Sequence, residues 1–268
     1  MTGIEYVEAA AAQTMPGLRL ALTVGVPGPW GQAAMFAFDY KGIPYTPVAQ
    51  YAGEDNADLV AWTGIRNAPI AVFNDEAPRS NALDIVALAE RITATPGLIP
   101  KEAAERQRCF GISWDICGEG GFGWTRRITM SQPLPPELQA LADTPDDGVP
   151  PLSNRDNMAR AYRPAEAEVR AAEDRLCAML DSFAATLTAQ AKRGSPYFVG
   201  ESPTLCDLQW AAFTAVLEPL PHADNPMPNW LRARYMYLGD RVAKHKHTIL
   251  LEHRDHMFAQ HLSLPLRF

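Results

Sequence analysis

Several classes of protein are excluded by features that this sequence lacks. Basic residues are not in excess: 24 Lys and Arg stand against 31 Asp and Glu, which gives a net charge of −7. Nucleic-acid-binding proteins usually carry a basic stripe, so this balance argues against such a partner. No run of about 18 apolar residues occurs, so no membrane-spanning helix is predicted. The N-terminal segment lacks a basic stretch followed by an apolar one, so we expect no secretory signal and a cytoplasmic protein.

Cysteine and histidine are also scarce. The 4 cysteines lie far apart and form no C-x-x-C pair, so reduced thiols are expected rather than a disulfide framework. Most of the 6 histidines lie near the C-terminus. His253 and His256 can share one helical face, as a metal site would require, but a solvated helix at the end of the chain is the favoured interpretation. No metal is therefore predicted.

Residues 1–93 alternate between strand and helix patterns. From Leu18 onward apolar residues recur with the period of two that is typical of a strand. The next helix should begin at Pro29, because proline suits the first helical position, and should end before Gly42. The expected elements are strands at 18–24, 45–51 and 70–73 and helices at 29–41, 53–64 and 81–92, after an extension at 1–17. The strand–helix–strand order predicts a parallel pair in a small α/β domain.

The rest of the chain predicts helices only. The clearest helix spans 165–193, where apolar residues recur every three or four positions and mark one buried stripe. Residues 133–156 are rich in Pro, Asp and Gly and predict a long loop. Further helices are expected at 101–111, from Thr204 onward, and within 229–262. With a break at 93–100, the sequence predicts an α/β domain at 1–93 and an all-helical domain at 100–268.

The string Gly118-Glu119-Gly120-Gly121-Phe122-Gly123 fits the G-x-G-x-x-G pattern of dinucleotide-binding loops. Such a loop follows a strand within a βαβ unit, whereas here a helical pattern precedes the string and no second strand follows. A broken helix is therefore favoured, because glycines weaken a helix interior, and a dinucleotide-dependent oxidoreductase is the less favoured alternative. Trp114 and Trp124 flank the string and predict either simple packing or the wall of an apolar ligand pocket.

A capping box predicts the start of one buried helix. Asp207 stands three residues after Thr204, so its carboxylate can accept the Thr204 N–H while Thr204 caps the first turn. The apolar residues Leu208, Trp210 and Phe213 follow and are expected in the core. We expect a structural role for this motif.

Three motifs carry a resemblance to a known family. They are Lys41-Gly42-Ile43-Pro44-Tyr45, Asn67-Ala68-Pro69, and the stretch from Tyr197 to Asp207, YFVGESPTLCD. In this order they resemble the end of the first helix, the Val-Pro dipeptide and the signature before the buried sixth helix of cytosolic glutathione transferases. The resemblance covers 18–93 and 160–240. It implies a thioredoxin-like N-terminal domain, an all-helical C-terminal domain, glutathione as co-substrate and a homodimer.

The resemblance implies where the centre of glutathione lies. In the family the proline of the dipeptide is cis, and the residue before it pairs through its N–H and C=O with the cysteinyl backbone of glutathione. The matching residues here are Ala68 and Pro69, next to Asn67. A cis bond at Pro69 would turn the chain and expose the backbone of Ala68.

The residues that would bind the γ-glutamyl end depart from the family. The acidic residue and serine that the family uses there fall on Asn81 and Ala82. Ser80 or Asn81, with a helix N-terminus, can take this role, because such an end attracts a carboxylate. Arg79 can add a charge-assisted contact or lie in a solvated turn.

The catalytic position departs as well. The serine or cysteine of family members falls on Gly28, and no tyrosine lies in the first strand, so the catalytic residue stays unknown. Lowering a thiol pKa by two units takes about 2.7 kcal/mol. A hydrogen bond to a charged group contributes about 1.5–3 kcal/mol and a helix N-terminus about 0.3–1 kcal/mol. The helix beginning at Pro29 can therefore favour a thiolate, with the Trp30 and Gln32 side chains as candidate donors, although Trp30 equally suits packing between the domains.

Together these features predict a glutathione transferase-like protein that conjugates or reduces an apolar electrophile. The electrophile is expected near Trp114, Phe122 and Trp124, beside the glutathione sulfur. The missing catalytic side chain leaves a second interpretation open: a non-catalytic binding or interaction protein with the same fold.

Overall fold

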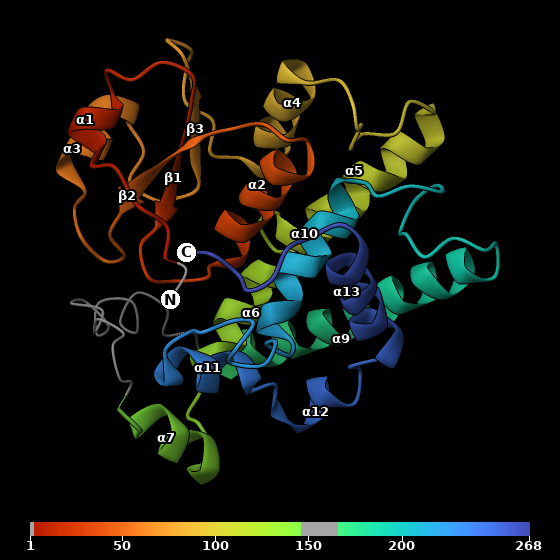
Figure 1. Ribbon diagram of the computed structural model, residues 1–268. Helices are drawn as coiled ribbons and strands as arrows, with labels where there is room; N and C mark the ends of the chain where they lie inside the picture. Colours follow the sequence, from red (N-terminus) through yellow and green to blue (C-terminus); the bar gives the residue numbers. More distant parts are fainter. Residues whose placement is uncertain (1–2, 146–165) are drawn as a thin grey trace.

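The computed structural model describes residues 3–145 and 166–268. Near the N-terminus lies a 3-stranded sheet in the order β2-β1-β3 (Figure 1). Its strands are β1 (Leu18–Thr23), β2 (Thr46–Gln50) and β3 (Ile70–Phe73). β1 pairs in parallel with β2, which confirms the expected parallel pair, and antiparallel with β3. The register places Ala21 between Val48 and Ile70.

Two pairs of helices cover the two faces of this sheet: α1 (Ala9–Ala12) and α3 (Ala57–Thr63) on one face, α2 (Pro29–Tyr40) and α4 (Ala82–Ile92) on the other. The leucines of β1 pack against α2 and α4, whereas Ala21 faces α1 and α3. The period of two in the sequence therefore corresponds to alternation between two buried faces. The segment predicted as an extension belongs to this layer, because Val7 pairs with Val48 of β2.

Helices make up the rest of the described chain, as predicted. They are α5 (Ala103–Cys117), α6 (Phe122–Met130), α7 (Pro136–Asp143), α9 (Glu166–Ala191), α10 (Leu205–Phe213), the 3-10 helix η1 (Thr214–Val216), α11 (Asn229–Met236), α12 (Gly239–Ala243) and α13 (Thr248–Gln260). All residues of α10 are buried, and α10 packs against α2, α5 and α13 (Figure 1). A thioredoxin-like domain is thus joined to a helical domain. The exact boundaries at 93 and 100 stay a prediction.

The glycine-rich string forms a tight connection between α5 and α6, which confirms the broken helix. Gly120 has a φ of 76°, in the left-handed region that favours glycine. A Cβ at Gly118 would lie 2.6 Å from the Trp114 side chain, and one at Gly123 would lie 2.1 Å from the Phe213 ring. Close packing accounts for these glycines. Because α5 rather than a strand precedes them, they do not form a dinucleotide-binding loop.

The loop predicted at 133–156 is wrong over part of its length. Helix α7 occupies 136–143, with Pro135 at the N-cap and Pro136 at the first helical position. Proline is tolerated there because the N–H groups of the first turn have no partner within the helix. Residues 146–156 of the predicted loop lie outside the described residues. Helix α5 is also longer than predicted, since it continues to Cys117.

The prediction of a solvated C-terminal helix is wrong as well. Leu250, His253 and Met257 of α13 are buried against the helical domain. The buried face also includes Arg254, so polar residues interrupt the apolar spacing that normally reveals a packed helix.

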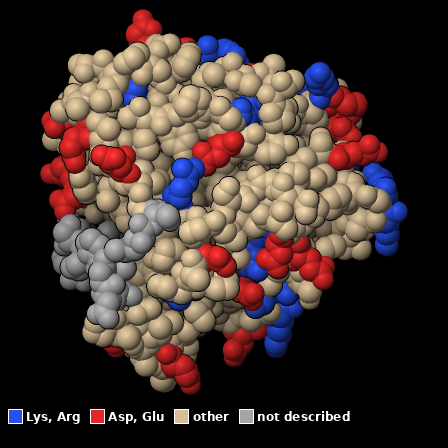
Figure 2. Space-filling view, viewed as in Figure 1, with Lys and Arg blue, Asp and Glu red and all other residues tan. Residues whose placement is uncertain are grey.

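Charged side chains of both signs are interspersed on the face shown in Figure 2, and uncharged residues form most of that face. Within the described chain, no helix combines the length and the apolar character that crossing a bilayer requires.

Candidate functional site

A cavity of about 1180 Å³ lies between the thioredoxin-like domain and the helices that follow it. Its walls come from the first turn of α2, the segment before β3, the start of α4, and helices α5, α6 and α11. Segments far apart in the sequence therefore share one concave surface, which is the usual form of a small-molecule site.

The first turn of α2 forms one end of this cavity. Gly28 is the N-cap and Pro29 the first helical residue, and both line the cavity together with Trp30. α2 lies close to β1, since a Cβ at Gly31 would lie 3.3 Å from the Leu22 side chain. A helix N-terminus carries unpaired N–H groups and a partial positive charge, so this end of the cavity suits a thiolate or a carboxylate.

The segment before β3 forms a second wall. The Ala68–Pro69 peptide bond is cis, as the resemblance implied. Asn67, Ala68 and Pro69 all line the cavity, with Asn67 exposed and Ala68 half-buried. The structure thus brings these three predicted residues together with the start of α2.

The start of α4 supplies Ser80 and Asn81 to the cavity, whereas Arg79 does not line it. The Asn81 side-chain oxygen accepts the Leu83 N–H at 2.8 Å and caps α4. The Arg79 guanidinium donates to Glu76 at 2.8 Å and so forms an ion pair outside the cavity. Of the predicted γ-glutamyl contacts, Ser80 and Asn81 are therefore placed at the cavity and Arg79 is not.

The two side-chain donors expected near the sulfur are engaged elsewhere. The Trp30 indole N–H donates to the Cys117 carbonyl at 2.9 Å, and its ring meets Phe213 edge-on at 4.8 Å. The Gln32 amide donates to the Arg267 carbonyl at 2.8 Å. Trp30 thus packs α2 against the helical domain, and the backbone N–H groups of α2 are the donors that face the cavity end.

Two of the three aromatic residues expected around the electrophile line the cavity. Trp114 is 51% exposed and Trp124 is 39% exposed. Phe122 does not line the cavity, because it is fully buried and its ring packs 5.2 Å from the Trp210 ring. Residues two apart on a helix point about 200° apart, so Phe122 and Trp124 of α6 face opposite sides.

Sequence reasoning missed Arg127 and Tyr6, which also line the cavity. The Arg127 guanidinium lies over the Trp30 ring, 4.1 Å from its centre, and 5.7 Å from the centre of Trp124. The Tyr6 hydroxyl is buried, and burial raises the pKa of Tyr6 to about 12. The spacing of three between Trp124 and Arg127 was a visible signal, because it places both on one helix face. Tyr6 gave none, since it lies in the segment predicted as an extension.

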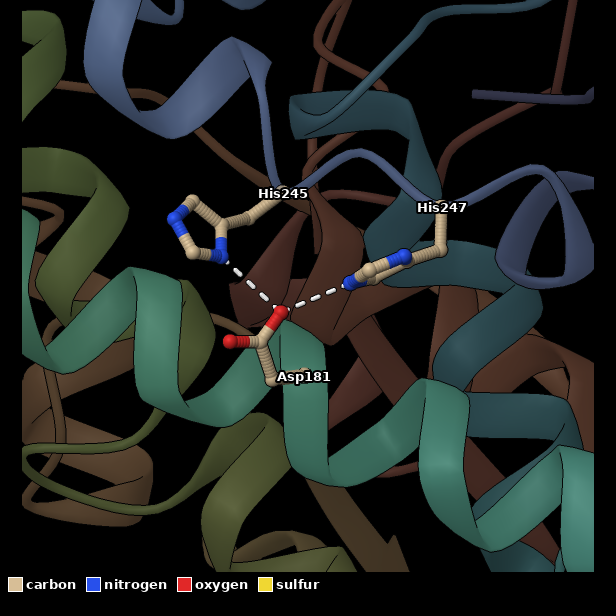
Figure 3. A group of neighbouring side chains, drawn as sticks. All are labelled: Asp181, His245 and His247. Carbon is tan, nitrogen blue, oxygen red and sulfur yellow. Dashed lines mark hydrogen bonds and ion pairs between the residues drawn. The ribbon is translucent and has the colours of Figure 1, made fainter.

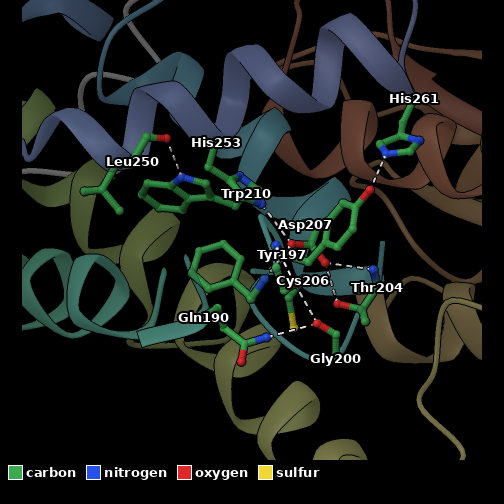
Figure 4. A network of polar contacts seen from close by, with 12 residues as sticks. Gln190, Tyr197, Gly200, Thr204, Cys206, Asp207, Trp210, Leu250, His253 and His261 are labelled. Atoms are coloured by element: carbon green, nitrogen blue, oxygen red, sulfur yellow. Dashed lines mark hydrogen bonds and ion pairs between the residues drawn. The ribbon is translucent and has the colours of Figure 1, made fainter. Parts of the chain in front are cut away.

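A second polar cluster surrounds Asp207 at the start of α10 (Figure 4). One carboxylate oxygen accepts the N–H and the hydroxyl of Thr204, both at 2.7 Å. The other accepts the Phe198 N–H at 2.9 Å and lies 2.8 Å from His253 Nε2. These contacts confirm the predicted capping box. Asp207 and His253 are buried away from the cavity, so the cluster is structural.

A third cluster contains residue types that can hold a metal ion. Asp181 of α9 lies beside His245 and His247, which connect α12 to α13 (Figure 3). His245 Nδ1 is 2.9 Å and His247 Nε2 is 2.6 Å from the same oxygen of Asp181. The pair considered from the sequence, His253 and His256, is not part of such a group: among the described residues, three ligand atoms come together only at Asp181, His245 and His247.

Several solved structures share this architecture. A glutathione S-transferase from Methylobacterium radiotolerans JCM 2831, solved with glutathione sulfonate, is 14% identical, with a TM-score of 0.56 over 91% of each chain. A β-etherase from Sphingobium sp. strain SYK-6 is 14% identical, with a TM-score of 0.55 over 90% of this chain and 99% of its own. A maleylacetoacetate isomerase from Methylobacterium extorquens AM1, solved with malonate and glutathione, is 18% identical, with a TM-score of 0.50 over 85% of this chain and 95% of its own.

No protein-family model matches the sequence, and no curated protein matches it either. At identities this low, structural similarity shows the fold. The chain has the fold of the glutathione S-transferases, a thioredoxin-like domain followed by a helical domain.

Proposed function

We propose that this chain is a glutathione transferase that conjugates or reduces an electrophile with an apolar body. One observation carries the proposal: in a fold shared with glutathione S-transferases, a single cavity joins the start of α2, the Ala68–Pro69 segment and two tryptophans, Trp114 and Trp124. Two of the similar solved structures hold glutathione or glutathione sulfonate. Glutathione is therefore the co-substrate that we assign to the cavity.

In this proposal the cysteinyl backbone, the γ-glutamyl carboxylate and the sulfur of glutathione each meet a group suited to them. The Ala68 backbone pairs with the cysteinyl backbone, while Ser80 and Asn81 receive the γ-glutamyl carboxylate at the N-terminus of α4. The sulfur lies at the N-terminus of α2. Its thiol proton leaves to solvent, and the helix N–H groups stabilise the thiolate because they form charge-assisted hydrogen bonds to it. The thiolate then attacks the electrophilic carbon, and the leaving group departs with the bonding electron pair.

The rival interpretation is a non-catalytic binding or interaction protein that binds glutathione without ionising it, or does not bind it. Its support is that Gly28 offers no hydroxyl or thiol and that the Trp30 and Gln32 side chains donate elsewhere. The two interpretations differ in one measurable quantity, the pKa of the bound thiol. A free thiol has a pKa of about 8.5.

The experiment is titration of glutathione into the protein, followed by thiolate absorbance of the complex as pH rises. We expect saturable binding and a bound-thiol pKa well below that of free glutathione. Saturable binding with an unshifted thiol pKa would support the non-catalytic rival. Absence of binding would contradict the transferase and leave only the interaction protein.

A matched pair of variants tests the placement. Ala68→Pro removes one backbone N–H at the cavity, and about a tenfold loss of glutathione affinity is expected for a lost hydrogen bond. Ala77→Pro makes the same change before Pro78, in an exposed turn outside the cavity, and should leave affinity unchanged. Circular dichroism of both variants checks that the fold is retained.

We also propose, from the resemblance alone, that the protein is a homodimer of the cytoplasm. Sedimentation of the purified chain should give twice its sequence mass. A monomeric mass across the micromolar range would contradict the dimer.

A further inference from the structure

Arg127 offers the cavity a positive charge that no acidic residue of the described chain neutralises in an ion pair. Its guanidinium stacks over Trp30 and near Trp124 on α6. In the ranges 3–145 and 166–268, no oxygen accepts a hydrogen bond from it. Stacking occupies the flat face of a guanidinium and leaves its N–H edge available. The tryptophans therefore fix the orientation of a group whose N–H edge is not used by any described residue.

The neighbouring arginine shows what a satisfied guanidinium looks like in this helix. Arg126 is fully buried and donates to the carbonyls of Val216 and Tyr237, both at 2.8 Å, and to the Thr129 hydroxyl at 2.6 Å. Successive residues on a helix point about 100° apart, so Arg126 faces the core and Arg127 faces the cavity. The charged lining residues are three arginines and two acids: Arg66, Arg127, Arg234, Asp55 and Glu119.

We propose that Arg127 binds an anionic group, a carboxylate or sulfonate, on the second substrate. The planar guanidinium pairs with such a group through two parallel hydrogen bonds. The apolar or aromatic body of the substrate lies against Trp114 and Trp124. This inference rests on the proposed function for the identity of the nucleophile, but the binding of the anion does not depend on it.

Tryptophan fluorescence provides a test that requires no catalysis. The probes are 4-nitrobenzoate and its neutral isostere 4-nitrobenzamide, which quench nearby indoles on binding. The wild-type protein should bind the benzoate about tenfold more tightly, as expected for a charge-assisted hydrogen bond. Arg127→Gln should abolish this preference and Arg127→Lys should retain part of it. Arg108→Gln, an equal charge change at an exposed residue outside the cavity, should leave the preference intact.

Equal binding of the two probes by the wild-type protein, or a preference that survives Arg127→Gln, would overturn the inference. A second assay, the conjugation of glutathione to 4-chloro-3-nitrobenzoate, tests the proposed function separately from the anion site. A preference for the anion without any conjugation would contradict the proposed function and leave the anion site standing. Conjugation without a preference for the anionic probe would support the proposed function and contradict the anion site.

A different observation, independent of the cavity, concerns Asp181, His245 and His247 (Figure 3). Two imidazole nitrogens converge on one carboxylate oxygen, and the three ligand atoms lie within 4.8 Å of one another. All three side chains are partly exposed, so an ion and its water ligands can reach them. His247 is the N-cap of α13, whose inner face is buried, so the histidines are held on a packed element.

The geometry points to a site for zinc or another divalent transition-metal ion. Zinc takes imidazole nitrogen and carboxylate oxygen at about 2.0–2.2 Å and keeps an open position when three protein ligands bind it. An ion between the three atoms would replace the protons now shared by the histidines and Asp181. To admit the ion, the Asp181 oxygen and the two imidazole nitrogens would move slightly apart from their present separations of 2.9 and 2.6 Å, and water would complete the coordination.

Calorimetric titration of zinc chloride into the full chain, after treatment with a chelator, tests this site. One ion per chain should bind, and the double variant His245→Ala/His247→Ala should weaken binding at least about tenfold. His222→Ala removes a different exposed histidine and should leave binding unchanged. Cobalt should give visible absorption bands in the wild-type protein that the double variant lacks. Zinc binding that the double variant retains, or no binding by the wild-type protein, would overturn the assignment.

Discussion

The Asp207 cluster and the cavity wall at Arg127 are both polar regions beside tryptophan side chains, yet they differ in how their hydrogen bonds are used. Each carboxylate oxygen of Asp207 has two protein partners. At the cavity, Arg127 is stacked without an acceptor among the described residues, and the Tyr6 hydroxyl and a Gln32 oxygen have no partner there either. A carboxylate whose two oxygens are fully hydrogen-bonded stabilises a fold, whereas the open N–H edge of the stacked Arg127 guanidinium is available to a ligand.

The largest expected effect on stability is at the Asp207 cluster. Asp207→Ala leaves the buried N–H groups of Phe198 and Thr204 and the His253 ring without their acceptor. Breaking such a buried charged network is expected to lower the free energy of unfolding by about 3–5 kcal/mol. Urea unfolding measures this loss. Asp174→Ala, which removes an exposed ion pair with Arg241, is the control and should cost under about 1 kcal/mol. Equal losses of unfolding free energy in the two variants would show that the Asp207 cluster stabilises the fold no more than a surface ion pair does.

An intermediate effect is expected at Arg126. Arg126→Met leaves the Val216 and Tyr237 carbonyls and the Thr129 hydroxyl without a donor, and each lost bond costs about 1 kcal/mol. Burial lowers the pKa of Arg126 to about 9, so removing the buried charge offsets part of this cost. We expect a net loss of about 1–3 kcal/mol in the free energy of unfolding. A gain in stability would show that charge burial outweighs these hydrogen bonds.

The smallest effect on stability is expected at Arg127, the next residue of α6. Arg127→Met removes only stacking on Trp30 and Trp124, which is worth about 0.5–1 kcal/mol at an exposed site. Thermal unfolding of this variant beside Arg126→Met compares two adjacent arginines with the same chemical change. A loss at Arg127 as large as that at Arg126 would mean that Arg127 is a structural residue, and the comparison would fail.

The local elements were predictable from the sequence. The period of two in β1, the proline that starts α2 and the glycines that separate α5 from α6 act over a few residues and need no distant contact. The capping box at Thr204 and Asp207 was visible for the same reason. The motifs that carry the resemblance also singled out Asn67, Ala68 and Pro69, which line the cavity; that they bind glutathione stays a prediction.

Other features depended on contacts that the sequence does not display. Phe122 was expected at the pocket, but the rotation of α6 against α10 turns it into the core beside Trp210. Arg79 was expected near the γ-glutamyl end, but Glu76 holds it outside. The packing of α13 was missed because Asp207, 46 residues earlier, makes a buried histidine acceptable at position 253.

The sequence by itself determined the order of the strands and of most helices, with their starts and breaks, because capping, turn formation and apolar periodicity act between near neighbours. Only the tertiary structure decided which polar side chains are already engaged and which face the cavity. Trp30 and Gln32 donate their side-chain hydrogen bonds to carbonyls 87 and 235 residues away, whereas Arg127 has no acceptor among the described residues. Hydrogen bonds between distant segments depend on how those segments pack. The residue pattern within one segment therefore does not predict them.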